Sequence, residues 1–113
     1  MKKTEMLKEN RRFRYLYSKG KSAAFPLFVL YFKENRSSKN RMGITVSKKI
    51  GGAVVRNRAK RVIREAYRLI EEDISDGYDF IFVARTKTAQ VSMNEVKSQL
   101  YKAMKKHKLL KSI

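Results

Sequence analysis

The chain has 113 residues, of which 28 are Lys or Arg and 10 are Asp or Glu, so its formal net charge is +18 at pH 7. This length predicts a single domain over residues 1–113 and excludes two large ones, and 42% hydrophobic residues are too many for a charged disordered tail. Because cysteine is absent, disulfides, thiolate catalysis and Cys-based zinc sites are excluded.

A short basic helix is predicted near the amino-terminal end. Asn10 is a candidate N-cap, and Gly20 is placed to end the helix. The apolar residues between them recur at spacings of three and four, and they are Phe13, Leu16 and Tyr17. Arginine and lysine surround this stripe, so the exposed side of the helix is expected to be strongly basic.

Two strands are predicted next, separated by the polar loop 34–40. Residues 27–33 are rich in β-branched and aromatic types, and their alternation places Tyr31 and Lys33 on the face opposite Leu30. Alternation over residues 42–47 indicates a second strand, which we expect to be antiparallel to the first across the loop. Since Pro26 cannot donate to a central ladder, a short leading strand is expected to end near Phe25.

The second half of the chain predicts a helix, a strand and a helix. Between Ala53 and Ile70, apolar residues at helical spacing occupy one arc and basic residues the opposite arc. A turn at Asp76 and Gly77 precedes a strand over residues 78–84, and Ser92 opens a capping box before a final lysine-rich helix. The predicted fold is an α/β (α+β) two-layer sandwich of order αβββαβα, with three helices and a mixed, mainly antiparallel sheet of about four strands.

Residues 48–64 carry basic charges and no acid. A solvated helix usually interleaves Glu with Lys, and here no acid appears before Glu65. A merely soluble face is one interpretation, but an RNA-backbone contact is favoured because the planar fork of arginine grips two phosphate oxygens at once. Asn57 could hydrogen-bond a base edge or a 2′-hydroxyl, and capping or solvation is an equal alternative for it.

A second candidate surface is aromatic. Tyr31 shares a strand face with Lys33, and Phe13 is flanked by Arg12 and Arg14. Single-stranded nucleic acid is bound by bases stacked on aromatic rings with cations nearby, at about 1–3 kcal/mol for each base. The alternative for these rings, together with Tyr17, is an ordinary place in the core.

Catalysis by the protein itself is not indicated, and no catalytic or metal-ligating residue is assigned. His107 is the only histidine and lies among lysines, so we expect a solvated residue in a frayed tail. The acidic run 71–73 is better explained as the polar end of a helix than as a metal site.

Charge and hydropathy indicate the compartment and the partners. No secretory signal is evident, and the longest apolar stretch, residues 25–32, is too short to span a bilayer. We therefore expect a cytoplasmic protein. A net charge of +18 makes nucleic acid the leading partner and an anionic membrane surface the second.

One long segment resembles the signature of the protein subunit of bacterial ribonuclease P. It comprises residues 41–51, RMGITVSKKIG, and residues 53–65, AVVRNRAKRVIRE. The resemblance extends over nearly the whole chain, in the same order of elements. It implies a ribonucleoprotein endonuclease that removes the 5′ leader from precursor tRNA, with helices on one side of the sheet and the other face open for leader RNA. It also implies a left-handed crossover around the Arg-Asn-Arg helix, although about 98% of parallel crossovers are right-handed.

The resemblance implies two sets of site residues. The residues expected against the catalytic RNA are Lys48, Lys49, Arg56, Asn57, Arg58, Lys60, Arg61 and Arg64. Arg68 is added to this set because it lies on the basic arc of the same helix. The set expected around the single-stranded leader, in a cleft between the first helix and the sheet, is Phe13, Tyr17, Tyr31 and Lys33, with Arg12 beside them. Position 17 is often Phe in this family, and Tyr keeps the stacking face while adding a hydroxyl.

The implied partners are the catalytic ribonuclease P RNA and precursor tRNA, with no membrane and a free protein that is monomeric. No cofactor is expected on the protein alone, since Mg²⁺ is expected through the RNA subunit, which performs the hydrolysis. Two other classes stay open on the residues alone. One is a structural RNA-binding protein, such as a small ribosomal protein without leader recognition, and the other is a protein-only nuclease.

Overall fold

The structure is a computed structural model and describes residues 3–111. Its elements are β1 (Thr4–Met6), α1 (Asn10–Lys19), β2 (Lys21–Ala24), β3 (Phe28–Glu34), β4 (Asn40–Thr45), α2 (Ala53–Ile70), β5 (Tyr78–Ala84) and α3 (Met93–Lys106). Three short 3-10 turns join them, namely η1 (Lys48–Ile50), η2 (Glu71–Asp73) and η3 (Thr86–Gln90). The predicted α+β class, with three helices, is confirmed.

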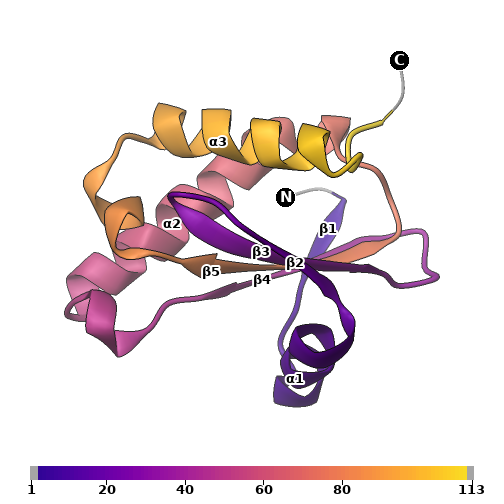
Figure 1. Ribbon diagram of the computed structural model, residues 1–113, viewed down its shortest axis with the longest axis horizontal. Coiled ribbons are helices and arrows are strands. Elements are labelled where there is room, and N and C mark those ends of the chain that lie inside the picture. Colours follow the sequence, from indigo (N-terminus) through magenta and orange to yellow (C-terminus); the bar gives the residue numbers. More distant parts are fainter. Residues whose placement is uncertain (1–2, 112–113) are drawn as a thin grey trace.

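The sheet has five strands in the order β1-β4-β5-β3-β2, against about four predicted. α2 and α3 cover one face and α1 lies against the other (Figure 1), so the expectation that all helices lie on one side is wrong. Two strand pairs are antiparallel, β2 with β3 and β3 with β5. The other two, β1 with β4 and β4 with β5, are parallel, so the sheet is mixed, with two antiparallel and two parallel strand pairs.

The predicted pairing of β3 with β4 is wrong, because β5 lies between them. β3 and β4 do run in opposite directions, but the strand that each of them pairs with toward the centre of the sheet is β5. The reason is burial. β5 places Phe80 and Phe82 on one face and Ile81 on the other, all three fully buried. A strand that is apolar on both faces is buried best at the centre of a sheet.

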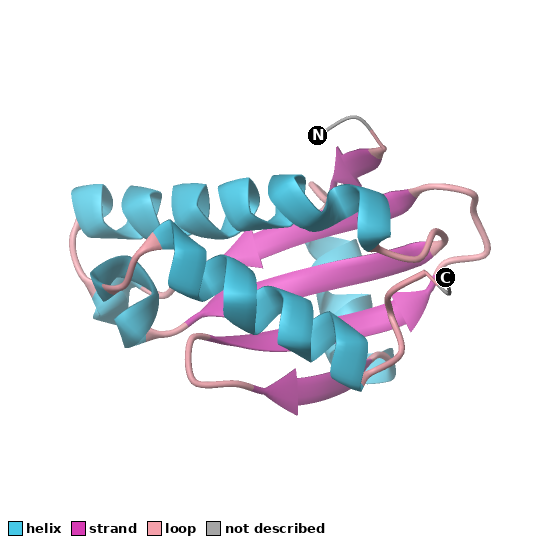
Figure 2. Ribbon diagram, turned by 90° about the horizontal axis from the view of Figure 1, so that it is seen from above, coloured by secondary structure: helices cyan, strands magenta, loops and turns pink. Residues whose placement is uncertain are grey.

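The connection from β4 through α2 to β5 is left-handed, as the resemblance implied. Figure 2 looks onto the helix-covered face, with α2 in front of the sheet. β4 and β5 are parallel neighbours. For an observer on that face who looks along β4 toward its carboxyl end, β5 lies on the left (Figure 2). This hand is opposite to that of about 98% of such connections.

The larger core lies between the sheet and the α2/α3 layer, and the smaller one beneath α1. In the larger core, Ile63 and Tyr67 of α2 and Leu100 of α3 belong to the same buried cluster as the β3 and β5 phenylalanines. In the smaller core, Leu7, Leu16 and Ile81 are buried, with half-buried rings and a valine around them. α1 therefore covers only part of its face of the sheet.

β1 was not predicted. It is short and polar, but it is fixed from two sides. Its backbone pairs with β4, and the Thr4 hydroxyl lies 2.9 Å from the buried Tyr67 hydroxyl of α2. Burial is the main cause that raises the pKa of Tyr67 to about 12, with the charge of Glu71 adding to the rise and the Thr4 hydrogen bond opposing it. A neutral Tyr67 thus helps to hold the amino-terminal strand against α2.

The helix ends are close to those predicted. α1 begins at Asn10 itself, with Glu9 rather than Asn10 as the N-cap residue and no side-chain cap. The Gly20 backbone N–H donates to the Leu16 carbonyl and ends α1 as expected. At α3, the Ser92 side chain accepts from the Glu95 backbone N–H, which confirms the predicted cap.

The expectation that His107 lies in a frayed, solvated tail is wrong. The imidazole is half-buried and packs against Phe25 and Phe32, with ring centroids 6.0 and 5.4 Å away. The residues after it are also anchored, because Leu109 is buried and Leu110 forms a β-bridge with Ile74. Apolar contacts on both sides of His107 therefore override the local run of lysines.

Candidate nucleic-acid interface

Six cations form what we call the α2 basic surface. α2 turns Ala59, Ile63 and Ala66 inward, which directs its basic residues outward, and η1 adds two lysines just before the helix. Within residues 3–111, none of the six makes an ion pair. The α2 amino terminus carries no acid in its first turn and no side-chain cap, so the helix dipole adds positive potential. The six are Lys48, Lys49, Arg56, Lys60, Arg61 and Arg64.

Two predicted arginines are held by the protein itself. The Arg58 Nε donates to the Ala89 carbonyl at 3.0 Å, which ties this side chain to η3. Arg68 forms an ion pair with Glu65, one turn earlier on the helix, and also donates a hydrogen bond to it. This hydrogen bond is the main cause that lowers the pKa of the Glu65 carboxyl. The expectation that the basic residues of this helix have no acidic partner in the protein is therefore wrong at Arg68. The predicted Asn57 is exposed, and its side chain has no hydrogen-bond partner in the described part of the chain.

The three predicted aromatic residues lie together, and we call them the aromatic face. The ring centroids of Tyr17 and Tyr31 are 4.8 Å apart and edge to face, and those of Phe13 and Tyr17 are 6.4 Å apart. The Tyr17 hydroxyl lies 2.9 Å from that of Thr45 on β4. Tyr17 is 38% exposed, so this cluster between α1 and the sheet keeps a surface open to a ligand.

Gly43 on β4 makes room for this arrangement. A Cβ at position 43 would lie 2.5 Å from the Cζ and 2.8 Å from the Cε1 of Phe13. Since Cβ contacts below 3.0 Å essentially never occur, the Phe13 ring can rest on the strand only because residue 43 is glycine. Alternation along this strand puts Gly43 and Thr45 on one face, but the alternation does not indicate that Phe13 covers that face.

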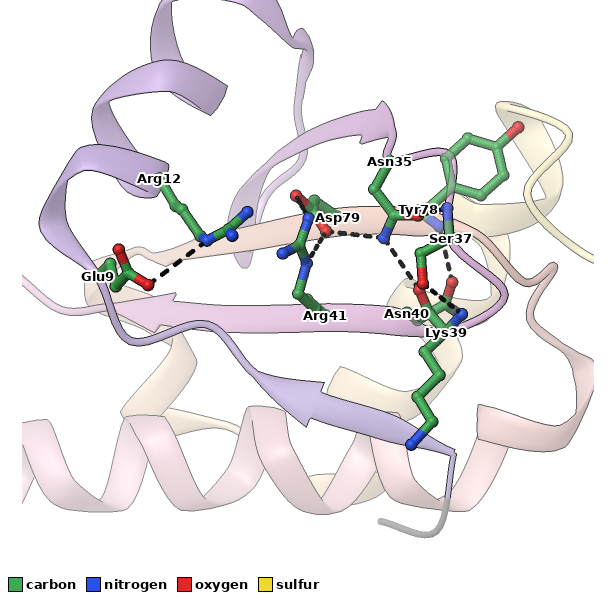
Figure 3. Close-up of polar contacts among 9 residues, drawn as sticks. All are labelled: Glu9, Arg12, Asn35, Ser37, Lys39, Asn40, Arg41, Tyr78 and Asp79. Atoms are coloured by element: carbon green, nitrogen blue, oxygen red, sulfur yellow. Dashed lines mark hydrogen bonds and ion pairs between the residues drawn. The ribbon is translucent and has the colours of Figure 1, made fainter.

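Lys33 continues the aromatic face along β3 and keeps a free charge. It lies in register with Asp79, but the Asp79 carboxylate already accepts hydrogen bonds from other side chains. Arg41 donates to it at 2.8 and 3.0 Å, and the Asn35 amide donates at 2.9 Å. Figure 3 shows Arg41 and Asn35 converging on Asp79. Among residues 3–111, Lys33 has no ion pair, so its ammonium is available beside Tyr31.

Arg12 is less free than predicted. Its Nε lies 3.8 Å from the Glu9 carboxylate, in a loose pair that Figure 3 shows at the start of α1. Glu9 also accepts a 2.7 Å hydrogen bond from Arg11. Both pairs are exposed, and exposed pairs are weak, so an incoming phosphate can compete for either arginine.

The α2 basic surface and the aromatic face adjoin at one end of the sheet. Thr45, which Tyr17 contacts, is the last residue of β4, and η1 begins at Lys48. A single strand of RNA can therefore pass from stacked rings to a row of phosphate-binding cations. Across residues 3–111 no group of three or more His, Asp or Glu residues is placed to hold a metal ion, and no helix is long and apolar enough to cross a bilayer.

Known proteins similar to this chain point to one family. The family model described as Ribonuclease P matches residues 1–108. The ribonuclease P protein component of Alkaliphilus oremlandii is 44% identical over 112 residues, which is 99% of this chain and 98% of that protein. The same component from Clostridium botulinum is 42% identical over 105 residues, covering 92% of this chain and 95% of that protein.

Solved structures agree with the sequence comparison. The Staphylococcus aureus RNase P protein superimposes with a TM-score of 0.84 and 34% identity, over 94% of this chain and 97% of that one. The RNase P protein from Thermotoga maritima gives a TM-score of 0.82 and 32% identity, over 90% and 96%. The chain therefore belongs to the ribonuclease P protein family.

Proposed function

We propose that this chain is the RNA-binding protein subunit of ribonuclease P and assists removal of the 5′ leader from precursor tRNA. The observation that carries the proposal is the junction of two surfaces at the end of β4, one made of unpaired cations and the other of clustered rings. The α2 basic surface binds the catalytic RNA. The aromatic face and Lys33 bind the single-stranded leader.

The work of the protein is electrostatic and positional. Cations that lack a carboxylate partner within residues 3–111 neutralise phosphates without first breaking an internal ion pair. The rings of the aromatic face stack on leader bases at about 1–3 kcal/mol each. Hydrolysis belongs to the RNA subunit and its Mg²⁺. We infer a cytoplasmic protein that is monomeric when free, since a net charge of +18 opposes self-association.

Substrate preference tests this proposal. Tyr31→Ala is expected to weaken binding of leader-bearing precursor tRNA to the holoenzyme by about 5- to 150-fold, which corresponds to 1–3 kcal/mol of stacking. Leaderless tRNA should bind unchanged. Tyr15→Ala is the matched control, because Tyr15 is 55% exposed on α1 and outside the aromatic face. Fluorescence titration with both substrates measures the effect.

Two results would contradict the proposal. Equal loss for leader-bearing and leaderless tRNA would favour a structural RNA-binding protein without a leader site. Magnesium-dependent cleavage of precursor tRNA by the chain, with all RNA subunit removed, would favour a protein-only nuclease.

A further inference from the structure

A cavity of about 340 Å³ lies at the end of the sheet where β2 and β5 begin and β3 ends. Its walls come from these three strands and from the end of α3. The volume is within the range of small-ligand sites, about 300–1,000 Å³. Lys33 belongs to both the cavity wall and the predicted leader site, but Phe32, Tyr78 and His107 place the cavity on the side of the sheet that α3 covers, opposite Tyr31. The cavity and the aromatic face therefore lie on opposite sides of β3, with Lys33 bordering both.

The charges around the cavity favour an anion. Lys21, Lys33 and Lys108 line it, and none of them has an ion pair within residues 3–111. One carboxylate, that of Glu34, also lines it and likewise has no ion pair or hydrogen bond to another described side chain. The Lys33 ammonium lies on the face of Tyr31, so Lys21 and Lys108 supply the two ammonium groups of the cavity. Two ammonium groups and one carboxylate still leave a net positive wall that attracts a phosphate and keeps one acceptor free.

Lys108 occupies a backbone conformation that favours glycine. Its φ is +58°, in the left-handed region, directly after α3. Helices commonly end with glycine in this conformation, because a side chain there is strained. A lysine at this position costs some stability relative to glycine and places an ammonium group at the cavity.

The remaining walls are flat and aromatic. Tyr78 stacks on Phe80 with centroids 5.8 Å apart and 19° between planes, and its half-exposed side lines the cavity. The imidazole of His107 lines the cavity from α3 and packs on Phe32. Its Nε2 is buried and has no hydrogen-bond partner in the described protein. A small shift of this ring would let a ligand supply that partner.

We propose that this cavity binds one nucleotide of single-stranded RNA and reads its base. The phosphate contacts the lysines, and the base lies against Tyr78 and His107. Glu34 accepts a hydrogen bond from an exocyclic amino group, as carboxylates do from cytosine, so uracil is disfavoured. This inference rests on the proposed function, because the 5′ leader is the single-stranded RNA in question, and it must pass around the end of β3 at Lys33 to enter the cavity.

The single histidine makes a direct test possible. Titration of the full chain with CMP or UMP, followed by the NMR resonance of the His107 imidazole, reports on this cavity alone. A saturable shift with CMP, and a weaker affinity for UMP, is the expected result. The absence of a saturable shift with either nucleotide would overturn the proposal.

Variants separate binding from folding. Lys108→Gly removes the ammonium and the backbone strain, so the chain should melt no lower than the parent while CMP affinity falls about tenfold. Lys106→Ala removes the same charge from an exposed neighbour outside the cavity and should change CMP affinity little. Equal effects of the two variants would indicate unspecific attraction and overturn the proposal. Glu34→Gln should abolish the preference for CMP over UMP, and its persistence would overturn base reading by Glu34.

The leader assay with Tyr31→Ala is independent of these titrations. If CMP fails to bind while Tyr31→Ala still removes the effect of the leader, only the cavity inference fails. If CMP binds and Lys108→Gly weakens it while Tyr31→Ala leaves leader affinity unchanged, the cavity stands and the leader assignment fails.

Discussion

Two arginines on one helix face allow the electrostatic argument to be tested quantitatively. Arg61 is exposed and has no ion pair within residues 3–111, whereas Arg68 is paired with Glu65. Each phosphate neutralised by the protein contributes about −0.7 to −0.9 to the slope of log K against log salt. If all six cations of the α2 basic surface contact phosphate, the slope should be about −4 to −5.5.

Alanine at these two positions should therefore have unequal effects. Arg61→Ala is expected to flatten the slope by about 0.7–0.9, the share of one contact. Arg68→Ala should flatten it much less, because RNA must displace Glu65 before Arg68 can contact a phosphate. Both variants lower the net charge by one, so a difference between them reports on contacts and not on the general field.

The assay is equilibrium binding of each variant to the catalytic RNA over a series of KCl concentrations at fixed free Mg²⁺. Equal flattening by the two variants would refute the reasoning that internal pairing decides which cations bind. A parent slope near zero would refute the phosphate contacts themselves.

Two further predictions concern stability. Gly43→Ala should lower the free energy of unfolding by about 1–3 kcal/mol through the clash with Phe13, and Phe13→Leu in the same chain should recover part of this loss. Denaturation that shows purely additive losses would contradict the contact. Because burial raises the pKa of Tyr67 from 10.0 to about 12, its contribution is fully present below pH 10 and is lost as the pH rises toward 12. Tyr67→Phe should therefore flatten the decline in stability between pH 10 and 12, and parallel alkaline unfolding curves would count against this.

The helices and the longer strands could be predicted because their signals are local. The apolar arc of α2 corresponds to the buried residues Ala59, Ile63 and Ile70, and Gly20 ends α1 through its own N–H. The neighbours of each strand could not be predicted in this way. The polar loop between β3 and β4 resembles a hairpin loop, but Asn35 in it hydrogen-bonds to Asp79 of β5, which is 44 residues away in sequence.

Very short elements and chain ends depend on distant partners as well. β1 has only three residues and no apolar alternation, so the local sequence does not predict a strand there. Its pairing with β4 and the contact of Thr4 with Tyr67 depend on residues far away in the sequence. The packing of His107 on Phe25 and Phe32 is hidden by the lysines around it.

For the candidate site, residue types were more informative than contacts. Basic residues close to aromatic ones in the sequence correctly suggested that Phe13, Tyr17 and Tyr31 share a surface. The structure places this surface between α1 and the sheet. The pairing of Arg68 with Glu65 was missed, although their spacing of three on a helix is itself a signal. Which of these residues contact RNA stays a prediction.

The position of β5 has a consequence for how the chain is made. β3 and β4 are joined through β5 and not to each other, so the sheet cannot be completed before β5, which ends at Ala84, is available. During synthesis, the chain up to Ala84 must leave the ribosome before the centre of the sheet can assemble. Until then only the two edges of the sheet, the β2–β3 hairpin and the β1–β4 pair, have their partners, and they stay unconnected until β5 joins them.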